Sequence, residues 1–200
     1  MYRIMSFLKR RADLERAAFF DWWLSQHAPL ASKVPGLNRY TISLAATPED
    51  TTFDGVAELW FDDAEAGKMT RADGAAHTAR IERLHVQEYP FVDTGSMPRF
   101  KLVAALKRRA DFDRAAFKTW WLDKHAPLVL EFPELARYQV NLVPEGEEEG
   151  MADGVAEVCF NDLETLRRII FSQQVKTVQQ DSVAHSSAIN RLLVQEHPIL

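Results

Sequence analysis

The amino-acid sequence repeats itself, and this duplication limits what the chain can fold into. Residues 9–44 and 107–142 share 21 identities in 36 positions, far beyond chance for two segments of one chain. The first match has an offset of 98 residues between the copies. The match recurs at 54–58 and 153–157, with an offset of 99, and at 86–88 and 194–196, with an offset of 108. The chain is therefore expected to contain one structural unit twice.

We place the first unit at residues 1–95 and the second at 98–200, because turn-forming residues lie between them. Alternating hydrophobicity predicts four strands per unit, and helical periodicity predicts two helices, in the order βαββαβ. The second helix is expected over 63–76 in one copy and over 162–183 in the other. This order is the ferredoxin-like arrangement, with both helices on one face of an antiparallel sheet. Two such sheets can cover each other's bare faces, so we expect an α+β fold in which two tandem units form one barrel.

Strand alternation assigns the two faces of each sheet, since residues two apart point to the same side. In the third strand of each unit one face is uniformly apolar and should lie under the helices: Ala57, Leu59, Phe61 and Ala156, Val158, Phe160. The opposite face carries Glu58, Trp60 and Glu157. Because unpaired buried charge is costly, this polar face indicates a ligand cavity between the two sheets. The alternative is that this face is exposed and its polar residues are solvated.

Composition excludes several classes of function. The net charge of −5 leaves no excess of Lys and Arg for nucleic acid. One cysteine, Cys159, rules out an internal disulfide and fits a reducing cytoplasm. No segment is apolar enough for a membrane span or a signal peptide, so we expect a cytoplasmic protein without a membrane partner.

Two motifs resemble the EthD family. The first is Trp-Trp-Leu followed by His-Ala-Pro-Leu and Arg-Tyr at 22–40, repeated at 120–138 with Glu134 where the family usually has glycine. The second is Asp-Gly-Val-Ala-Glu-Leu-Trp-Phe at 54–61. The resemblance implies the dimeric α/β-barrel fold, here with both halves from one chain. It also implies a range of activities on aromatic or polyketide-like compounds, including decarboxylases, dehydratases, cyclases and cofactor-free monooxygenases.

Histidines are the main candidates for chemistry. His27 and His125 follow the Trp-Trp pair and could act as general acid or base, or could instead bond the last carbonyls of their helix. The family usually has an aromatic residue four positions after an aspartate at the end of the second helix. The aspartates at this place in the two copies are Asp73 and Asp181. Histidine stands four positions after each of them, which adds His77 and His185 to the candidates.

Glutamates and arginines complete the predicted site. Glu58 and Glu157 are candidates to orient an imidazole or to transfer protons themselves, since burial would raise their pKa. Arg39 or Arg137 would hold a substrate carboxylate. The remaining substrate-binding candidates are Trp60, Tyr40, Tyr138 and His85.

No cofactor or metal is expected. The sequence lacks a phosphate-binding glycine loop and a dinucleotide fingerprint. A site built from His27, His77, His85 and Glu58 is possible by residue type, yet no closely spaced ligand motif supports it.

The copies differ at three positions of the polar face: Phe7 against Ala105, Trp60 against Cys159 and His85 against Leu193. These differences favour one asymmetric site over two equal ones.

The leading interpretation is a cofactor-independent lyase, a decarboxylase or dehydratase, that acts on an aromatic or polyketide-like acid. A cofactor-free monooxygenase or cyclase, or a non-catalytic carrier that supplies an oxygenase, remains an alternative. A homodimer of the duplicated chain is also possible.

Overall fold

The computed structural model describes residues 2–47, 51–67, 73–96 and 99–200. The chain divides into two compact units, Met1–Val86 with Val194–Leu200, and Gln87–Leu193. The boundary between them falls inside two long strands, because β4 and β8 each take part in the sheets of both units. Methionine 97 and proline 98 of the expected junction lie outside the described residues.

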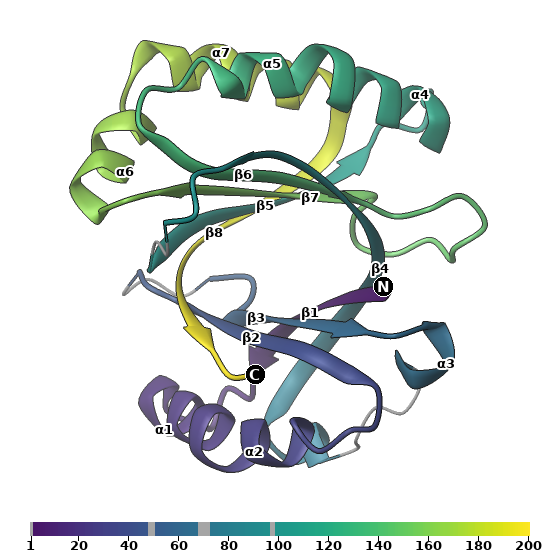
Figure 1. The fold of residues 1–200 in the computed structure, drawn as a ribbon, viewed down its shortest axis with the longest axis vertical. Coiled ribbons are helices and arrows are strands. Elements are labelled where there is room, and N and C mark those ends of the chain that lie inside the picture. The colour runs from purple at the N-terminus through teal and green to yellow at the C-terminus, as the bar shows by residue number, and fades with distance from the viewer. Residues whose placement is uncertain (1, 48–50, 68–72, 97–98) are drawn as a thin grey trace. The chain divides into compact units, whose positions relative to one another are not determined.

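Unit 1 contains the elements of the first repeat: β1 (Tyr2–Arg10), α1 (Arg16–Asp21), the π-helix η1 (Trp22–His27), α2 (Ala28–Ala31), β2 (Leu37–Ala45), β3 (Gly55–Phe61), α3 (Ala64–Gly67), the 3-10 helix η2 (Asp73–Ala76) and the start of β4 (Thr78–Asp93). Its strands are antiparallel in the order β4-β1-β3-β2-β8. Helices α1 and α2 cover one face of this sheet (Figure 1).

Unit 2 contains the corresponding elements of the second repeat: β5 (Phe100–Arg108), α4 (Arg114–Trp120), the π-helix η3 (Trp121–His125), α5 (Ala126–Leu130), β6 (Leu135–Leu142), β7 (Gly154–Phe160), α6 (Leu163–Ile170), α7 (Gln173–His185) and β8 (Ser186–Pro198). Its strand order is β4-β6-β7-β5-β8. The α+β fold and the repeated βαββαβ order are confirmed. Among the described helices, none is long and apolar enough to cross a membrane.

The single helix expected over 162–183 is divided into two. Asp162 caps α6 by accepting the backbone N–H of Thr165 at 2.7 Å, and Ser172 begins a new helix by accepting the N–H of Val175 at 3.2 Å. A side chain that bonds its own backbone in this way starts a helix and interrupts the one before it. In unit 1 the equivalent region includes α3 and η2, and residues 68–72 between them lie outside the described part.

The apolar strand faces lie under the helices, as predicted. In unit 2 Ala156, Val158 and Phe160 belong to one cluster with Phe117 and Trp121 of the helices. The equivalent cluster of unit 1 contains Ala57, Phe61, Phe19 and Trp23 at the same repeat positions, with Leu59 packed against it. This burial holds the helices on the sheet of each unit.

A buried aspartate explains why Lys-Arg-Arg begins each repeat. In unit 2 the carboxylate of Asp153 accepts the backbone N–H of Arg108 at 3.1 Å and lies 3.3 Å from the Lys107 ammonium. In unit 1 Asp54 accepts the N–H of Arg10 at 2.9 Å and lies 3.4 Å from Lys9. These contacts join the end of the first strand to the start of the third, so the motif is structural.

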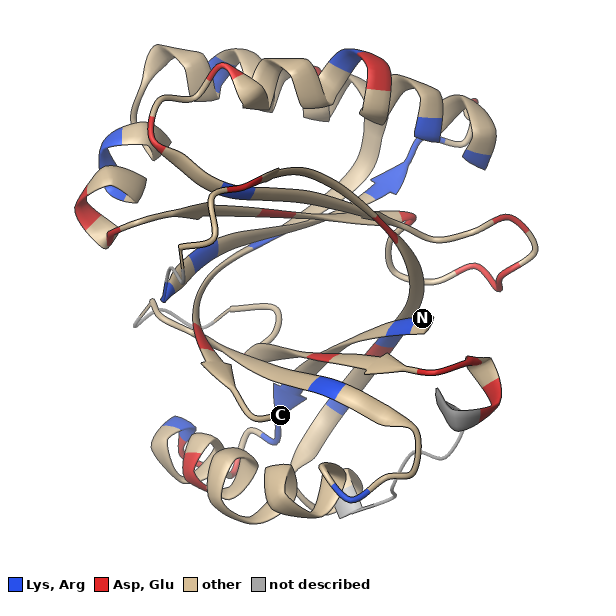
Figure 2. Cartoon of the chain, in the orientation of Figure 1, with Lys and Arg blue, Asp and Glu red and all other residues tan. Residues whose placement is uncertain are grey.

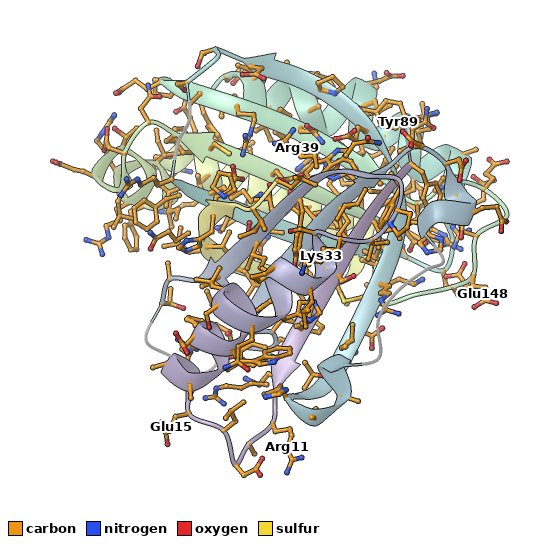
Figure 3. All side chains as sticks on the ribbon, turned by 60° about the horizontal axis from the view of Figure 1, so that its bottom comes forward. Arg11, Glu15, Lys33, Arg39, Tyr89 and Glu148 are labelled. Carbon is orange, nitrogen blue, oxygen red and sulfur yellow. The ribbon has the colours of Figure 1, made fainter. Side chains whose placement is uncertain are left out.

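The loop between β6 and β7 carries several acidic residues (Figure 2), and one of them is paired with basic residues. Glu149 forms ion pairs with Lys107 and Arg108, which lower its pKa to about 2. Glu148 projects outward from the same loop (Figure 3).

The glycine of each Asp-Gly motif is required by a tryptophan. A Cβ atom on Gly154 would lie 2.6 Å from Cζ3 of Trp121, and one on Gly55 would lie 2.9 Å from the same atom of Trp23 and 2.6 Å from the backbone oxygen of Ser43. These distances are shorter than carbon atoms tolerate, so any side chain would push the helix off the strand.

We therefore expect Gly154→Ala to lower the free energy of unfolding by about 1–3 kcal/mol, the usual cost of overpacking a core. Urea denaturation followed by tryptophan fluorescence measures this change. Gly74→Ala is the matched control, since its Cβ would meet Ile81 at an ordinary 3.4 Å. Equal stability of the two variants would contradict the packing argument.

Glu134 has a left-handed backbone conformation, with φ of 60°, where Gly36 in the first copy has φ of 76°. Such a conformation costs a non-glycine residue about 1–2 kcal/mol. The side chain of Glu134 forms an exposed ion pair with Arg168, which compensates little.

We expect Glu134→Gly to raise the free energy of unfolding by about 1 kcal/mol, because relief of strain outweighs the exposed pair. The mirror change Gly36→Glu should lower it. Both values come from urea denaturation, and a destabilised Glu134→Gly variant would show that the Arg168 pair matters more than the backbone.

Candidate functional site

A widened helical turn places a histidine beside a tryptophan in each unit. The backbone N–H of Ala126 bonds the carbonyl of Trp121, five residues earlier, and Ala28 bonds Trp23 in the same way. A proline follows each alanine, and its ring would clash with the carbonyl four residues earlier in a regular α-helix. The i→i+5 turn avoids this clash, and such turns are frequent at functional sites.

This turn brings together side chains that a regular α-helix would point apart. The rings of Trp120 and His125 have centroids 4.9 Å apart, and those of Trp22 and His27 are 5.2 Å apart. Residues five positions apart share a helix face only in the wider winding.

In unit 2 the His125 imidazole is bonded to a carboxylate of another helix. Its Nδ1 lies 2.7 Å from Oδ2 of Asp181 on α7, and His125 is only 4% exposed. The alternative that Nδ1 bonds the last carbonyls of its own helix is therefore wrong for His125. Asp181 fixes the ring orientation and favours the tautomer with the proton on Nδ1.

The other ring nitrogen of His125 faces a hydroxyl that is already bonded. Oγ of Ser182 donates to the carbonyl of Val178 at 2.8 Å and lies 3.4 Å from Nε2 of His125. The hydroxyl proton is thus directed to the carbonyl, which leaves the Nε2 lone pair able to accept a proton. Once protonated, Nε2–H could donate to Oγ of Ser182.

His185 and His77 stack on tryptophans. His185 lies 4.4 Å from the Trp120 ring with an interplanar angle of 16°, and its Nδ1 is 2.8 Å from the backbone carbonyl of Asp181. His77 stacks on Trp22 at 4.0 Å and 9° in unit 1. A stacking role suits an aromatic residue equally well, which explains how histidine can stand where the family has an aromatic side chain.

Between the helices and the sheet of unit 2 lies a cavity of ≈ 130 Å³. Its wall is mainly aliphatic and aromatic, from β5, β7, the helices and Trp121 of η3. Four polar residues also line it: His125, Gln179, Ser182 and Arg191. An apolar cavity with a few polar groups is the usual form of a small-molecule site.

Unit 1 has a smaller cavity of ≈ 70 Å³ in the equivalent place. Its lining includes His27, Trp23 and Arg83, which match His125, Trp121 and Arg191 by repeat position. Tyr40 also contributes to this wall. The duplication has therefore produced a helix-to-sheet cavity within each unit.

Burial lowers the pKa of His125 below its ordinary 6.5, although the Asp181 carboxylate acts in the opposite direction. The positive charges of His185 and Arg191 add to the decrease. The imidazole is accordingly neutral near pH 7, the form that accepts a proton.

The predicted glutamates are held in ion pairs. Oε2 of Glu58 is 2.6 Å from the Arg3 guanidinium, and both side chains are buried. Glu157 is 2.7 Å from the Lys101 ammonium in the same manner. The alternative that this strand face is solvated is wrong, since its charged side chains are buried and paired.

Other candidates pack within their units. The guanidinium groups of Arg3 and Arg39 each lie 4.3 Å from the Trp60 ring centre, and Arg39 belongs to the strand β2 (Figure 3). His85 meets the Tyr2 ring edge-on at 5.2 Å. Among the described lining residues, neither cavity includes Arg39 or His85.

Tyr138 and Arg137 of β6 are likewise absent from the described lining of the unit 2 cavity. Tyr138 is fully buried and stacks on Phe91 at 5.3 Å. Burial raises the pKa of its phenol, and the Trp121 side chain partly offsets the rise. Arg137 is half-buried.

The sequence interpretation missed Asp181 as the partner of His125, and it missed the lining residues Gln179, Ser182 and Arg191. A signal existed for Gln179 and Ser182. The residues of α7 that line the cavity recur at helical spacing: Val175, Val178, Gln179 and Ser182, and this period marks one face of a helix. Arg191 carried no comparable signal.

The chain belongs to the EthD family, since the EthD domain matches residues 11–95 and 109–185. The structure is similar to an anthrone oxidase-like protein, with a TM-score of 0.71, 6% identity, and coverage of 99% of this chain and 93% of that one. It is also similar to a variant of chlorite dismutase from Candidatus Nitrospira defluvii, with a TM-score of 0.63, 10% identity, and coverage of 99% and 92%. At such low identities these likenesses establish the fold alone.

An EthD family protein from Bacillus halodurans is 22% identical over 47% of this chain and 94% of its own, with a TM-score of 0.41. No curated protein sequence compared with the chain matches it.

The pKa of His125 makes stability depend on pH. Because the folded pKa lies below the unfolded value of 6.5, the unfolded chain binds the proton more tightly. We expect a contribution to stability that is present above pH 6.5 and is lost as the pH falls toward the folded pKa. Urea denaturation between pH 7.5 and 5 should show a shallower decline for His125→Gln than for the original protein.

NMR titration of the His125 ring tests the same shift directly. Asp181→Asn should lower the pKa of His125 further, because the carboxylate raises it. A His125 pKa at or above 6.5 in the original protein would contradict the argument from burial.

Proposed function

We propose that unit 2 is a cofactor-independent lyase that removes water from a small aromatic acid, with His125 as the proton-transferring residue. The observation that carries this proposal is the His125–Asp181 pair on the wall of an apolar cavity. An oriented imidazole in such a cavity has the geometry of a general base whose substrate is shielded from water.

The reaction balances with one histidine. Neutral His125 takes a proton from a carbon next to the substrate carbonyl, and the C–H electron pair forms the new double bond. The C–O bond to the departing hydroxyl breaks, and the imidazolium returns its proton to the oxygen, which leaves as water. The Asp181 carboxylate stabilises the imidazolium between the two steps.

Dehydration suits this site better than decarboxylation. Loss of CO₂ from an aromatic acid requires protonation of a ring carbon, so His125 would have to begin as an acid. Its lowered pKa leaves the imidazole neutral near pH 7. A neutral imidazole can start an elimination, whereas it has no proton to give to a ring carbon.

A second candidate is a cofactor-free oxidation by O₂, supported by the similarity to an anthrone oxidase-like protein. It would begin with the same proton abstraction by His125, after which the resulting carbanion would be oxidised by O₂. The two reactions differ in oxygen uptake. A carrier without catalysis would bind the compound and show neither reaction.

The test is exchange of the carbon-bound proton with solvent, because it reports on the base without requiring a complete turnover. We expect ¹H NMR in D₂O to show exchange with one or more members of a panel of aromatic β-hydroxy acids and ketones. His125→Gln should reduce its rate by about 10²–10⁴-fold, the usual contribution of a general base. Asp181→Asn should cause a smaller loss, since the imidazole remains but is no longer oriented.

His27→Gln is the matched variant in unit 1. Because the unit 1 cavity has about half the volume, we expect this variant to retain exchange. Unchanged exchange in His125→Gln would eliminate this histidine as the base, and oxygen consumption during turnover would favour the oxidation.

A further inference from the structure

The cavity of unit 2 is lined by a cation that has no side-chain partner among the residues that the structure describes. Arg191, on β8, lines the cavity together with His125 and Gln179. Across the described residues, no hydrogen bond or ion pair joins the Arg191 guanidinium to another side chain. Some other arginines of the unit are paired, such as Arg108 with Asp153 and Arg109 with Asp111.

Arg191 is an exposed residue of β8, and part of its side chain lines the cavity. Desolvation lowers the pKa of its guanidinium, and its charge is close enough to His125 to lower the pKa of that imidazole. A guanidinium at the wall of a cavity can bind an anionic ligand through charged hydrogen bonds. An anion in the cavity could therefore pair with Arg191.

The first repeat has an arginine in the same place. Arg83 lines the cavity of unit 1 and corresponds to Arg191 through the offset of 108 residues. Two positions further on, His85 stands in one copy and Leu193 in the other. The arginine at the cavity wall has therefore been retained by both copies where a neighbouring position has diverged.

The volume of the cavity limits the size of the ligand. An apolar protein cavity of about 150 Å³ holds one benzene molecule. The unit 2 cavity, at ≈ 130 Å³, therefore has room for a single ring beside Arg191. The unit 1 cavity, at ≈ 70 Å³, does not.

We infer that Arg191 determines specificity by binding the carboxylate of a monocyclic aromatic acid whose ring occupies the unit 2 cavity. This inference rests on the proposed function for the choice of cavity, and it assigns the carboxylate to Arg191 in place of Arg39 or Arg137. A planar guanidinium binds a carboxylate through two parallel hydrogen bonds. A dianionic phosphate would leave one charge unpaired against an apolar wall, so a carboxylate fits better.

Isothermal titration calorimetry of the full chain with four probes tests the inference: benzoate, benzamide, phenyl phosphate and 1-naphthoate. We expect benzoate to bind more tightly than the other three. Arg191→Gln should weaken benzoate by about 10- to 100-fold, the usual value of a charged hydrogen bond, and should leave benzamide unchanged. Arg191→Lys should restore part of the affinity for benzoate.

Arg167→Gln is the matched control, since it removes the same charge from an exposed position on α6 outside the cavity lining. Equal loss of benzoate binding in both variants would overturn the inference, because it would reflect net charge alone. Tighter binding of phenyl phosphate or of 1-naphthoate would overturn the assignment to a carboxylate or to a single ring, respectively.

The result is separable from the proposed catalysis. The acid-over-amide preference should persist in His125→Gln, because the imidazole moves a proton and Arg191 holds the carboxylate. Proton exchange without any effect of Arg191→Gln on binding would overturn this inference and spare the lyase. Binding that depends on Arg191, without any proton exchange, would support this inference and overturn the proposed lyase.

Discussion

The contact between a tryptophan and a glycine fixes each helix on its sheet. Trp121 lies against Gly154 so closely that even a Cβ atom would not fit between them, and Trp23 and Gly55 repeat this contact in unit 1. The contact determines the height of the helix above the strands, and with it the depth of the cavity. The wider turn that begins at the same tryptophan then places His125 at the cavity wall.

Charge inside each unit follows a consistent rule: carboxylates that are buried have cations beside them. Glu157 has Lys101, and Asp153 has the basic residues of the Lys-Arg-Arg motif. Buried ion pairs contribute little net stability, but loss of one partner is costly because the other is then unpaired. Glu58 and Glu157, which the sequence predicts as catalytic candidates, each form such a buried ion pair. Arg191 is a different case: it is an exposed cation that lines the unit 2 cavity, and no described carboxylate pairs with it.

The two copies share the residues that hold the helix on the sheet, but their cavities differ in volume. The residues that hold the helix on the sheet are identical in both copies, namely the Trp-Trp pair, His-Ala-Pro-Leu and Asp-Gly. The volumes of the two cavities differ about twofold. Small changes of side chain in a tightly packed wall alter the space directly, since protein interiors leave few voids. Two units of one fold can thus differ in the ligands they admit.

The sequence by itself determined the repeat, the βαββαβ order and the apolar strand faces, because these depend on periodicity and on local spacing. It did not determine the partner of His125. Asp181 is 56 positions away, and only the packing of α7 against η3 joins them. The sequence also gave no means to distinguish the paired glutamates from the unpaired Arg191, since pairing depends on which side chains meet in space. Tertiary structure decided that the cavity lies between helices and sheet within a unit, because a helix and a strand far apart in the chain form its walls.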